Sequence, residues 1–202
     1  VAATNRADYA QAQQLLEEAL AIDTAFAMAW RKLGVVYANQ GLAYKAREPL
    51  TRAFQFRDRL PDLERYLAIG SYYSTVEFDD DKAAAAWRSA LQIDSLDPVA
   101  TNNLALILSS QNDYQGALVL YNRAVTVRDS SPVAFTNLIF ALMDAGLTDS
   151  AEKIQALATR RTPGNIQLEG TATNLLFFKG DYAAAEARAR QLANRADLPA
   201  VI

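Results

Sequence analysis

The chain has 202 residues, of which 51% are hydrophobic, and its 20 basic and 23 acidic residues leave a net charge of −3. It contains no cysteine and no histidine. This excludes disulfides, thiolate nucleophiles and cysteine-ligated zinc, and it removes the most common general base and metal ligand. No block carries charge of one sign, so we expect no nucleic-acid partner. The longest uncharged runs are too short and too polar for membrane insertion.

Small residues recur at a fixed interval along the whole chain. Six alanines are separated by 34, 37, 34, 34 and 34 residues, and a second small or apolar residue follows each of them seven positions later. A period of this size is typical of a solenoid, in which each unit buries its apolar face against its neighbours. The six alanines are Ala12, Ala46, Ala83, Ala117, Ala151 and Ala185.

The chain is predicted to open in the middle of a unit. Residues from about Asp8 to Ile22 carry the alanine pattern of a second helix, so residues 1–26 form a half unit without a first helix. Five full units follow, and residues 198–202 form a tail. We place the full units at 27–62, 63–97, 98–131, 132–165 and 166–197.

Each full unit is predicted to be a helix–turn–helix. Apolar residues stand at places 4, 7, 8 and 11 of the first half, which is one face of a helix. In the first full unit they are Trp30, Leu33, Gly34 and Tyr37. A break rich in glycine, asparagine and aspartate follows in most units, and the second half carries the two alanines. The sequence therefore predicts an all-α, right-handed superhelical solenoid of about eleven helices in a single domain.

This pattern resembles the tetratricopeptide repeat, whose 34-residue unit has W-x2-L-G-x2-Y early and A-x3-F-x2-A late. The resemblance covers nearly the whole chain and implies that the tryptophans and most tyrosines are core residues. The last two units have lost much of the signature, since Glu169 and Thr173 depart from its aromatic and glycine places. The best matches are Trp30-x2-Leu33-Gly34-x2-Tyr37, Tyr66-x2-Ile69-Gly70-x2-Tyr73, Ala83-x3-Trp87-x2-Ala90 and Ala117-x3-Tyr121-x2-Ala124.

The 37-residue interval contains extra residues, about two near Arg57 to Pro61 and one near Glu77 to Asp81. The stretch from Arg57 to Tyr66 resembles repeat arrays of bacterial eukaryotic-like serine/threonine protein kinases and of winged-helix transcription regulators. The resemblance implies a parent protein with such a domain before the array, often beyond a membrane helix, which leaves the compartment open. This chain carries no kinase motif of its own. Its first residue is Val1 rather than methionine. We therefore interpret the chain as a fragment of a longer protein or as a processed chain.

The first helices of tetratricopeptide units line a groove, and the resemblance implies that ligand-binding residues lie on that face. We expect it to hold a protein or an extended peptide segment, because asparagine both donates to and accepts from a peptide backbone. Asn103 and Asn137 stand 34 residues apart and could form two rungs of such contacts, and the alternative is that these amides are solvated or bonded within the protein. The candidates are Arg31, Val35, Leu67, Ser71, Asn102, Asn103, Leu106, Thr136, Asn137, Phe140, Asn174 and Phe177.

Two charged clusters have plainer interpretations. Asp79 to Asp81 is the one tight acidic run, and we interpret it as the cap of the following helix rather than a metal site. The arginines near the C-terminus, among them Arg160, Arg188 and Arg195, are interpreted as solvated helix faces rather than an anion site.

These patterns together favour a non-catalytic binding scaffold, and we expect no cofactor and no metal. A signalling role attached to a kinase, a place in a transcription regulator, and self-assembly through uncapped repeat ends stay open as more specific readings. The absent histidine and cysteine, together with the lack of a convergent polar cluster, argue against an enzyme.

Overall fold

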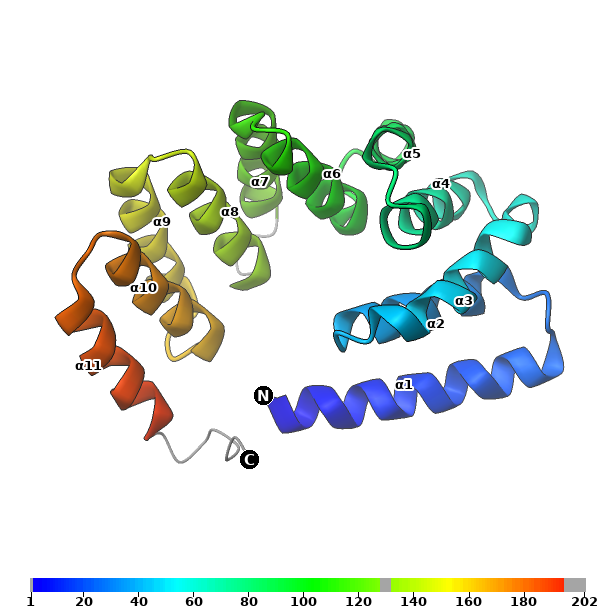
Figure 1. Cartoon of the computed structure of the whole chain (residues 1–202), viewed down its shortest axis with the longest axis horizontal. Coiled ribbons are helices and arrows are strands. Elements are labelled where there is room, and N and C mark those ends of the chain that lie inside the picture. Colours follow the sequence, from blue (N-terminus) through cyan, green and yellow to red (C-terminus); the bar gives the residue numbers. More distant parts are fainter. Residues whose placement is uncertain (1, 128–131, 195–202) are drawn as a thin grey trace. The chain divides into compact units, whose positions relative to one another are not determined.

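The computed structural model describes residues 2–127 and 132–194. Within these ranges all regular secondary structure is helical (Figure 1). The prediction of an all-α fold with about eleven helices is confirmed. The helices are α1 (Ala2–Ile22), α2 (Ala27–Asn39), α3 (Ala43–Gln55), α4 (Asp62–Tyr72), α5 (Asp80–Ile93), α6 (Pro98–Ser110), α7 (Tyr114–Val127), α8 (Pro132–Asp144), α9 (Thr148–Arg161), α10 (Ile166–Phe178) and α11 (Tyr182–Ala193).

The chain divides into two compact units, Val1–Leu104 and Ala105–Ile202. The first helices predicted at residues 27, 63, 98, 132 and 166 begin at those positions or one residue earlier, as α2, α4, α6, α8 and α10. The repeat boundaries thus agree with helix starts, while the single continuous solenoid stays a prediction. The tail 198–202 lies outside the described residues.

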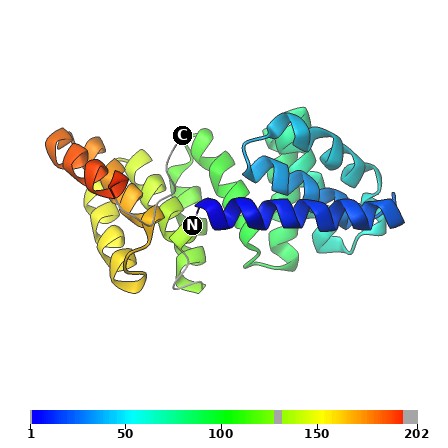
Figure 2. The ribbon, with the colours of Figure 1, turned by 90° about the horizontal axis from the view of Figure 1, so that it is seen from below.

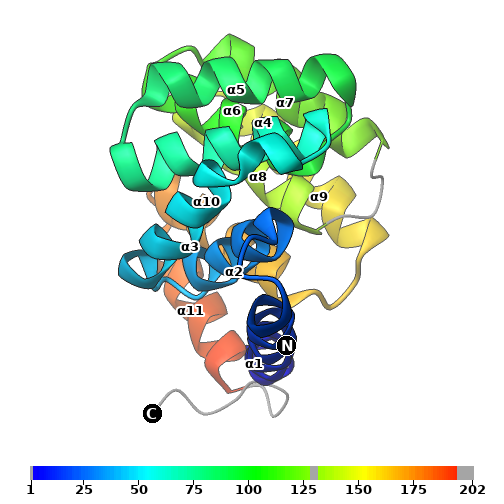
Figure 3. The ribbon, with the colours of Figure 1, turned by 90° about the vertical axis from the view of Figure 1, so that its right-hand side faces the viewer.

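In the first unit, hairpins close because a glycine of one helix receives a large side chain of the next. A Cβ atom on Gly34 would lie 2.6 Å from the Leu50 side chain, and one on Gly70 would lie 2.6 Å from the Trp87 ring. Trp87 is only 1% exposed. Such contacts leave no room for a larger residue, so these glycines fix how closely the paired helices pack. Helix α1 runs alongside α2, as seen from below in Figure 2 and along α1 in Figure 3.

The recurrent alanines are the contact residues of the second helices. Four of the six first-column alanines have no exposed surface, and Ala185 is nearly as buried. Small side chains at these points let the helices approach closely, as the sequence predicted. The four with no exposed surface are Ala46, Ala83, Ala117 and Ala151.

The extra residues of the long interval form two short irregular turns. A 3-10 turn spans Arg57–Arg59, and a π-helical turn spans Tyr73–Glu77 and ends at Phe78 with a φ of 56°. Arg59 donates from Nη1 to the Ala25 carbonyl at 2.9 Å, which ties the first insertion to the loop before α2. The first irregular turn therefore lies where the sequence placed the first insertion and has a structural role inside the unit, whereas the π-helical turn lies mostly before the predicted stretch from Glu77 to Asp81.

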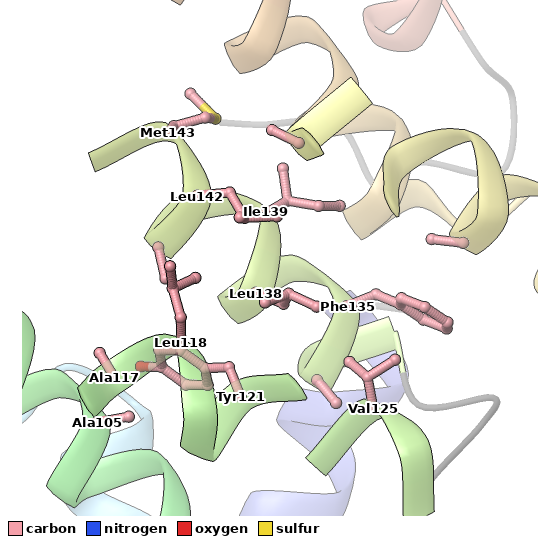
Figure 4. Close-up of a cluster of buried hydrophobic side chains, with 14 of the residues drawn as sticks. Ala105, Ala117, Leu118, Tyr121, Val125, Phe135, Leu138, Ile139, Leu142 and Met143 are labelled. Atoms are coloured by element: carbon pink, nitrogen blue, oxygen red, sulfur yellow. The ribbon is translucent and has the colours of Figure 1, made fainter. Parts of the chain in front are cut away.

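The second unit is built on a continuous apolar cluster of α7, α8 and α9 (Figure 4). Phe135, Leu138 and Ile139 project from α8 and have no exposed surface. Tyr121 of α7 packs against them, and burial, with a further contribution from Asp144, raises its pKa to about 12.

Three helix ends of the second unit show ordinary capping. Gly146 ends α8 with a φ of 72°, a left-handed conformation that favours glycine. Asn165 and Asp181 accept hydrogen bonds from backbone N–H groups three residues later and so begin α10 and α11. These stops and starts hold the successive helices of the second unit at a fixed length.

Candidate functional site

Four of the residues predicted to line a binding face are buried instead. Arg31 forms a 2.5 Å ion pair with Glu64 of α4, and its side chain is only 8% exposed. Ser71 donates to the Leu67 carbonyl at 2.8 Å, and Leu67 itself is buried. The Thr136 hydroxyl lies 3.4 Å from that of Thr171. Arg31 and Thr136 thus contact the first helix of the next repeat and Ser71 bonds within its own helix, so the face open to a ligand is narrower than the sequence suggested.

The predicted amides are half-buried on α6 and α8. Asn103 donates from Nδ2 to the Val99 carbonyl at 2.8 Å, a bond within its own helix. Asn102 and Asn137 are also half-buried. The Asn103 amide is therefore bonded within the protein, which agrees with the alternative interpretation. That Asn103 and Asn137 together bind a peptide backbone stays a prediction.

The remaining predicted residues are more accessible. Val35 and Phe140 are half-buried, whereas Leu106 and Phe177 are 53% and 64% exposed. Asn174 is exposed and, with Phe177 and Tyr182, lines a depression of about 380 Å³ between α10 and α11. Leu106, Asn174 and Phe177 are thus the members of the predicted set best placed to contact another molecule.

The acidic run forms a helix cap, which agrees with its plainer interpretation. The Asp79 carboxylate accepts from the Lys82 backbone N–H at 3.0 Å and pairs with its ammonium group at 2.8 Å. Hydrogen bonds from Lys82 lower the pKa of Asp79. Among the residues that the structure describes, no group of three or more histidine, cysteine, aspartate or glutamate side chains is arranged to hold a metal.

A first cleft, of about 530 Å³, lies in the first unit between α1 and α3, with α2 as its floor. Several of its polar side chains contact one another. The Tyr37 hydroxyl donates to Glu17 at 3.4 Å, and the Lys45 ammonium lies 5.9 Å from the centre of the Tyr37 ring. Burial and the neighbouring Glu17 raise the pKa of Tyr37. The other lining residues are Leu20, Trp30, Leu33, Tyr44, Glu48 and Pro49.

A second cleft, of about 540 Å³, lies in the second unit between α9 and α11, with α10 as its floor. It occupies the same place in the repeat as the first cleft, counted from Ala12 and Ala151. Its lining contains a buried amide and two arginines that the sequence did not single out as ligand-binding. The lining residues are Glu152, Gln155, Ala156, Thr159, Arg160, Ala172, Leu175, Leu176 and Arg188.

Comparison with known proteins gives the fold a name. The chain resembles the structure of PilW, a widely conserved type IV pilus biogenesis factor, with 22% identity and a TM-score of 0.69 over 94% of this chain and 86% of that one. It also resembles a tetratricopeptide repeat protein of Parabacteroides merdae, with 19% identity and a TM-score of 0.64 over 94% and 74%. The chain has the tetratricopeptide-repeat fold.

Sequence relatives of this tetratricopeptide-repeat chain are distant. No family model matches it. It is 25% identical over 130 residues to the peroxisomal targeting signal receptor of Kluyveromyces lactis, a match that covers 62% of this chain and 23% of that protein. The chain therefore spans less than a quarter of the receptor's length. Within the described ranges, no helix is both long and apolar enough to cross a membrane.

Proposed function

We propose that this chain is a non-catalytic scaffold that binds a protein or an extended peptide through the first helices of its repeats. The observation that carries the proposal is the exposure of Leu106 and Phe177 at positions that the repeat pattern assigns to a ligand-facing surface. Exposed large apolar side chains next to amides such as Asn174 suit a peptide with apolar side chains and a free backbone. The targeting-signal receptor among its relatives is in keeping with a recognition role.

The proposal is tested with a displayed library of random peptides selected on the wild-type chain. Substituting both Leu106 and Phe177 by alanine is expected to weaken the selected peptides by about tenfold or more, because apolar anchors dominate such contacts. The matched control is Val119→Ala, since Val119 is 67% exposed but lies on a second helix. Equal binding by all three proteins would refute the first-helix surface.

A more specific form of the proposal makes the chain the interaction or sensory module of a larger bacterial signalling protein of the serine/threonine kinase type. It rests on the segment Arg57 to Tyr66, which resembles arrays of such kinases. The sequence of the full gene tests it. A kinase domain before the array is the expected result, and a winged-helix domain would place the chain in a transcription regulator.

Self-assembly is the alternative to a heterologous partner. Phe177, Phe178 and Tyr182 are all more than half exposed around α10 and α11, and such a cluster can join copies of one chain. Sedimentation velocity over a wide concentration range distinguishes the two. A concentration-dependent dimer that Phe177→Ala abolishes would favour self-assembly, whereas a monomer at all concentrations leaves the peptide-binding scaffold as the function.

A further inference from the structure

The cleft between α9 and α11 contains a buried amide whose acceptor is unused. Gln155 is 8% exposed, and its Nε2 donates to the Leu168 carbonyl at 3.0 Å and to the Thr159 hydroxyl at 3.2 Å. Because the Leu168 carbonyl can only accept, these bonds fix which end of the amide is which. The Oε1 atom is left without a hydrogen-bond partner among the described residues. A buried acceptor without a donor is costly unless a ligand or water supplies one.

A second polar atom in the same cleft is equally unpaired. The Arg188 Nε of α11 is buried and has no hydrogen-bond partner within the described part of the chain. Arg160 adds a second guanidinium at the cleft from α9. The one acidic side chain of the lining, Glu152, is paired with Lys179, the residue after α10, and this pairing raises the pKa of the lysine. The cleft therefore presents a net positive charge around an apolar floor.

Comparison with the other repeats shows why the amide faces this cleft. Thr159 stands where Leu20, Phe54 and Val125 stand in other repeats, and Ala172 stands where they have leucine or isoleucine. In the first unit, Leu20 and Leu33 pack together and the residue matching Gln155, Leu16, does not line the cleft. The two small residues of the second unit thus let the cleft reach the buried amide.

We propose that the α9–α11 cleft binds an acidic peptide segment of a partner protein that carries one large apolar side chain. The apolar side chain packs on Ala172, Leu175 and Leu176. A backbone N–H of the segment donates to Gln155 Oε1, and its carboxylates accept from Arg188 and Arg160. A volume of about 540 Å³ holds one large side chain with its backbone, and mainly apolar walls with a few placed polar groups are typical of binding sites.

This inference is separate from the first-helix surface. The cleft is lined by α9, α10 and α11 residues that include neither Asn174 nor Phe177. The contrast with the first unit supports the choice, since the lining of the cleft between α1 and α3 has no buried polar side-chain atom without a partner among the described residues. Charge complementarity decides the occupant, because the two guanidinium groups of the lining favour carboxylates.

The test measures fluorescence anisotropy of labelled nonapeptides, acetylated and amidated at their ends, in which one leucine or phenylalanine is flanked by glutamates. A matched series has glutamine in place of every glutamate. We expect saturable binding of the acidic series to the wild-type chain. The affinity of the glutamine series should be lower by about tenfold or more. No binding of either series, or equal binding of both, would overturn the proposal.

Three variants locate the site. Thr159→Leu restores the large residue of other repeats and should abolish binding, and Arg188→Gln should weaken the acidic series about tenfold. Arg190→Gln is the matched control, because Arg190 is exposed and pairs with Glu186 on the same helix. Circular dichroism checks that each variant is folded. Unchanged binding by a folded Thr159→Leu protein would refute the cleft, and loss of binding only on substituting Leu106 and Phe177 would assign the peptide to the first-helix surface instead.

Discussion

The α4–α5 hairpin and the α9–α11 group fill the same positions of the repeat with opposite kinds of residue. In the hairpin, Gly70 receives the ring of Trp87. The position of Trp87 is held by Gln155 in α9, and the position of Gly70 by Thr173 in α10. Within its own hairpin Gln155 is matched with Ile139 of α8, and Thr173 is matched with Ala189 of α11, so neither hairpin pairs a glycine with a large aromatic side chain. At Gln155 the second helix therefore presents a polar side chain to a cleft, where α5 buries an aromatic ring.

First helices also join differently in the two units. Arg31 of α2 and Glu64 of α4 form a largely buried ion pair, whereas Thr136 of α8 and Thr171 of α10 place two hydroxyls 3.4 Å apart. The first arrangement depends on two charges remaining paired away from water, and the second depends mainly on shape. One repeat pattern thus accepts either an ion pair or a pair of hydroxyl groups between first helices. Loss of one side chain should destabilise the protein more at the ion pair than at the hydroxyl pair.

The largest expected effect comes from truncating the residue that fills the α4–α5 hairpin. Trp87→Ala should lower the free energy of unfolding by about 3–5 kcal/mol, because a fully buried aromatic ring leaves a cavity. Gln155→Ala, at the same position of the second unit, should cost about 1 kcal/mol, since it removes one hydrogen-bonded amide. Urea unfolding followed by circular dichroism measures both. Similar losses for the two variants would contradict this difference between the two positions.

The ion pair between first helices should be the next most sensitive feature. Glu64→Ala leaves the Arg31 guanidinium buried without its partner, and we expect a loss of about 2–3 kcal/mol in unfolding free energy. Thr171→Val keeps the shape of the matching contact in the second unit and should cost less than about 1 kcal/mol. Thermal unfolding compares the variants. Adding Arg31→Met to Glu64→Ala should recover most of the loss, and failure to do so would argue against a cost arising from unpaired charge.

The periodic positions explain which parts of the fold could be predicted from the sequence. Helix starts and alanine contacts follow from spacing alone, because every hairpin buries the same face. The burial of Arg31 could not be predicted in this way, since it depends on which side chain of the next repeat lies opposite. No acidic residue stands at the position of Glu64 in the other units. The repeat pattern therefore could not predict the ion pair of Glu64 with Arg31.

The cleft of the second unit left a weak signal in the sequence. Gln155 interrupts a column of large apolar residues, and Ala172 interrupts a column of leucine and isoleucine. Each departure by itself resembles ordinary drift of a repeat. Only the structure shows that Thr159 and Ala172 lie on the same cleft as Gln155 and Arg188, and that two of its buried polar atoms have no hydrogen-bond partner in the described part of the chain.

Tyr121 of α7 stands at the position of the repeat that Trp87 holds in α5 and Gln155 holds in α9. Its titration tests the effect of burying a hydroxyl group there. Burial raises its pKa to about 12, compared with about 10 in the unfolded chain. The unfolded state therefore loses its proton first, and stability that is fully present below pH 10 falls as pH rises toward 12, by on the order of 2 kcal/mol. Tyr121→Phe should not show this part of the alkaline loss. Parallel pH curves for the two proteins would contradict it.

The smallest expected effect has opposite signs in the two units. Gly70→Ala places a methyl group 2.6 Å from the buried ring of Trp87, which cannot move aside, and overpacking should cost about 1–2 kcal/mol even after the gain in helix propensity. Gly170→Ala in α10 is the matched control, because a Cβ there meets no atom within 4 Å. It should stabilise the protein by about 0.5–1 kcal/mol through propensity alone. Urea unfolding measures both changes. Stabilisation by both substitutions would show that the Trp87 ring can shift to make room for a methyl group. The close packing of the α4–α5 hairpin would then not explain why residue 70 is glycine.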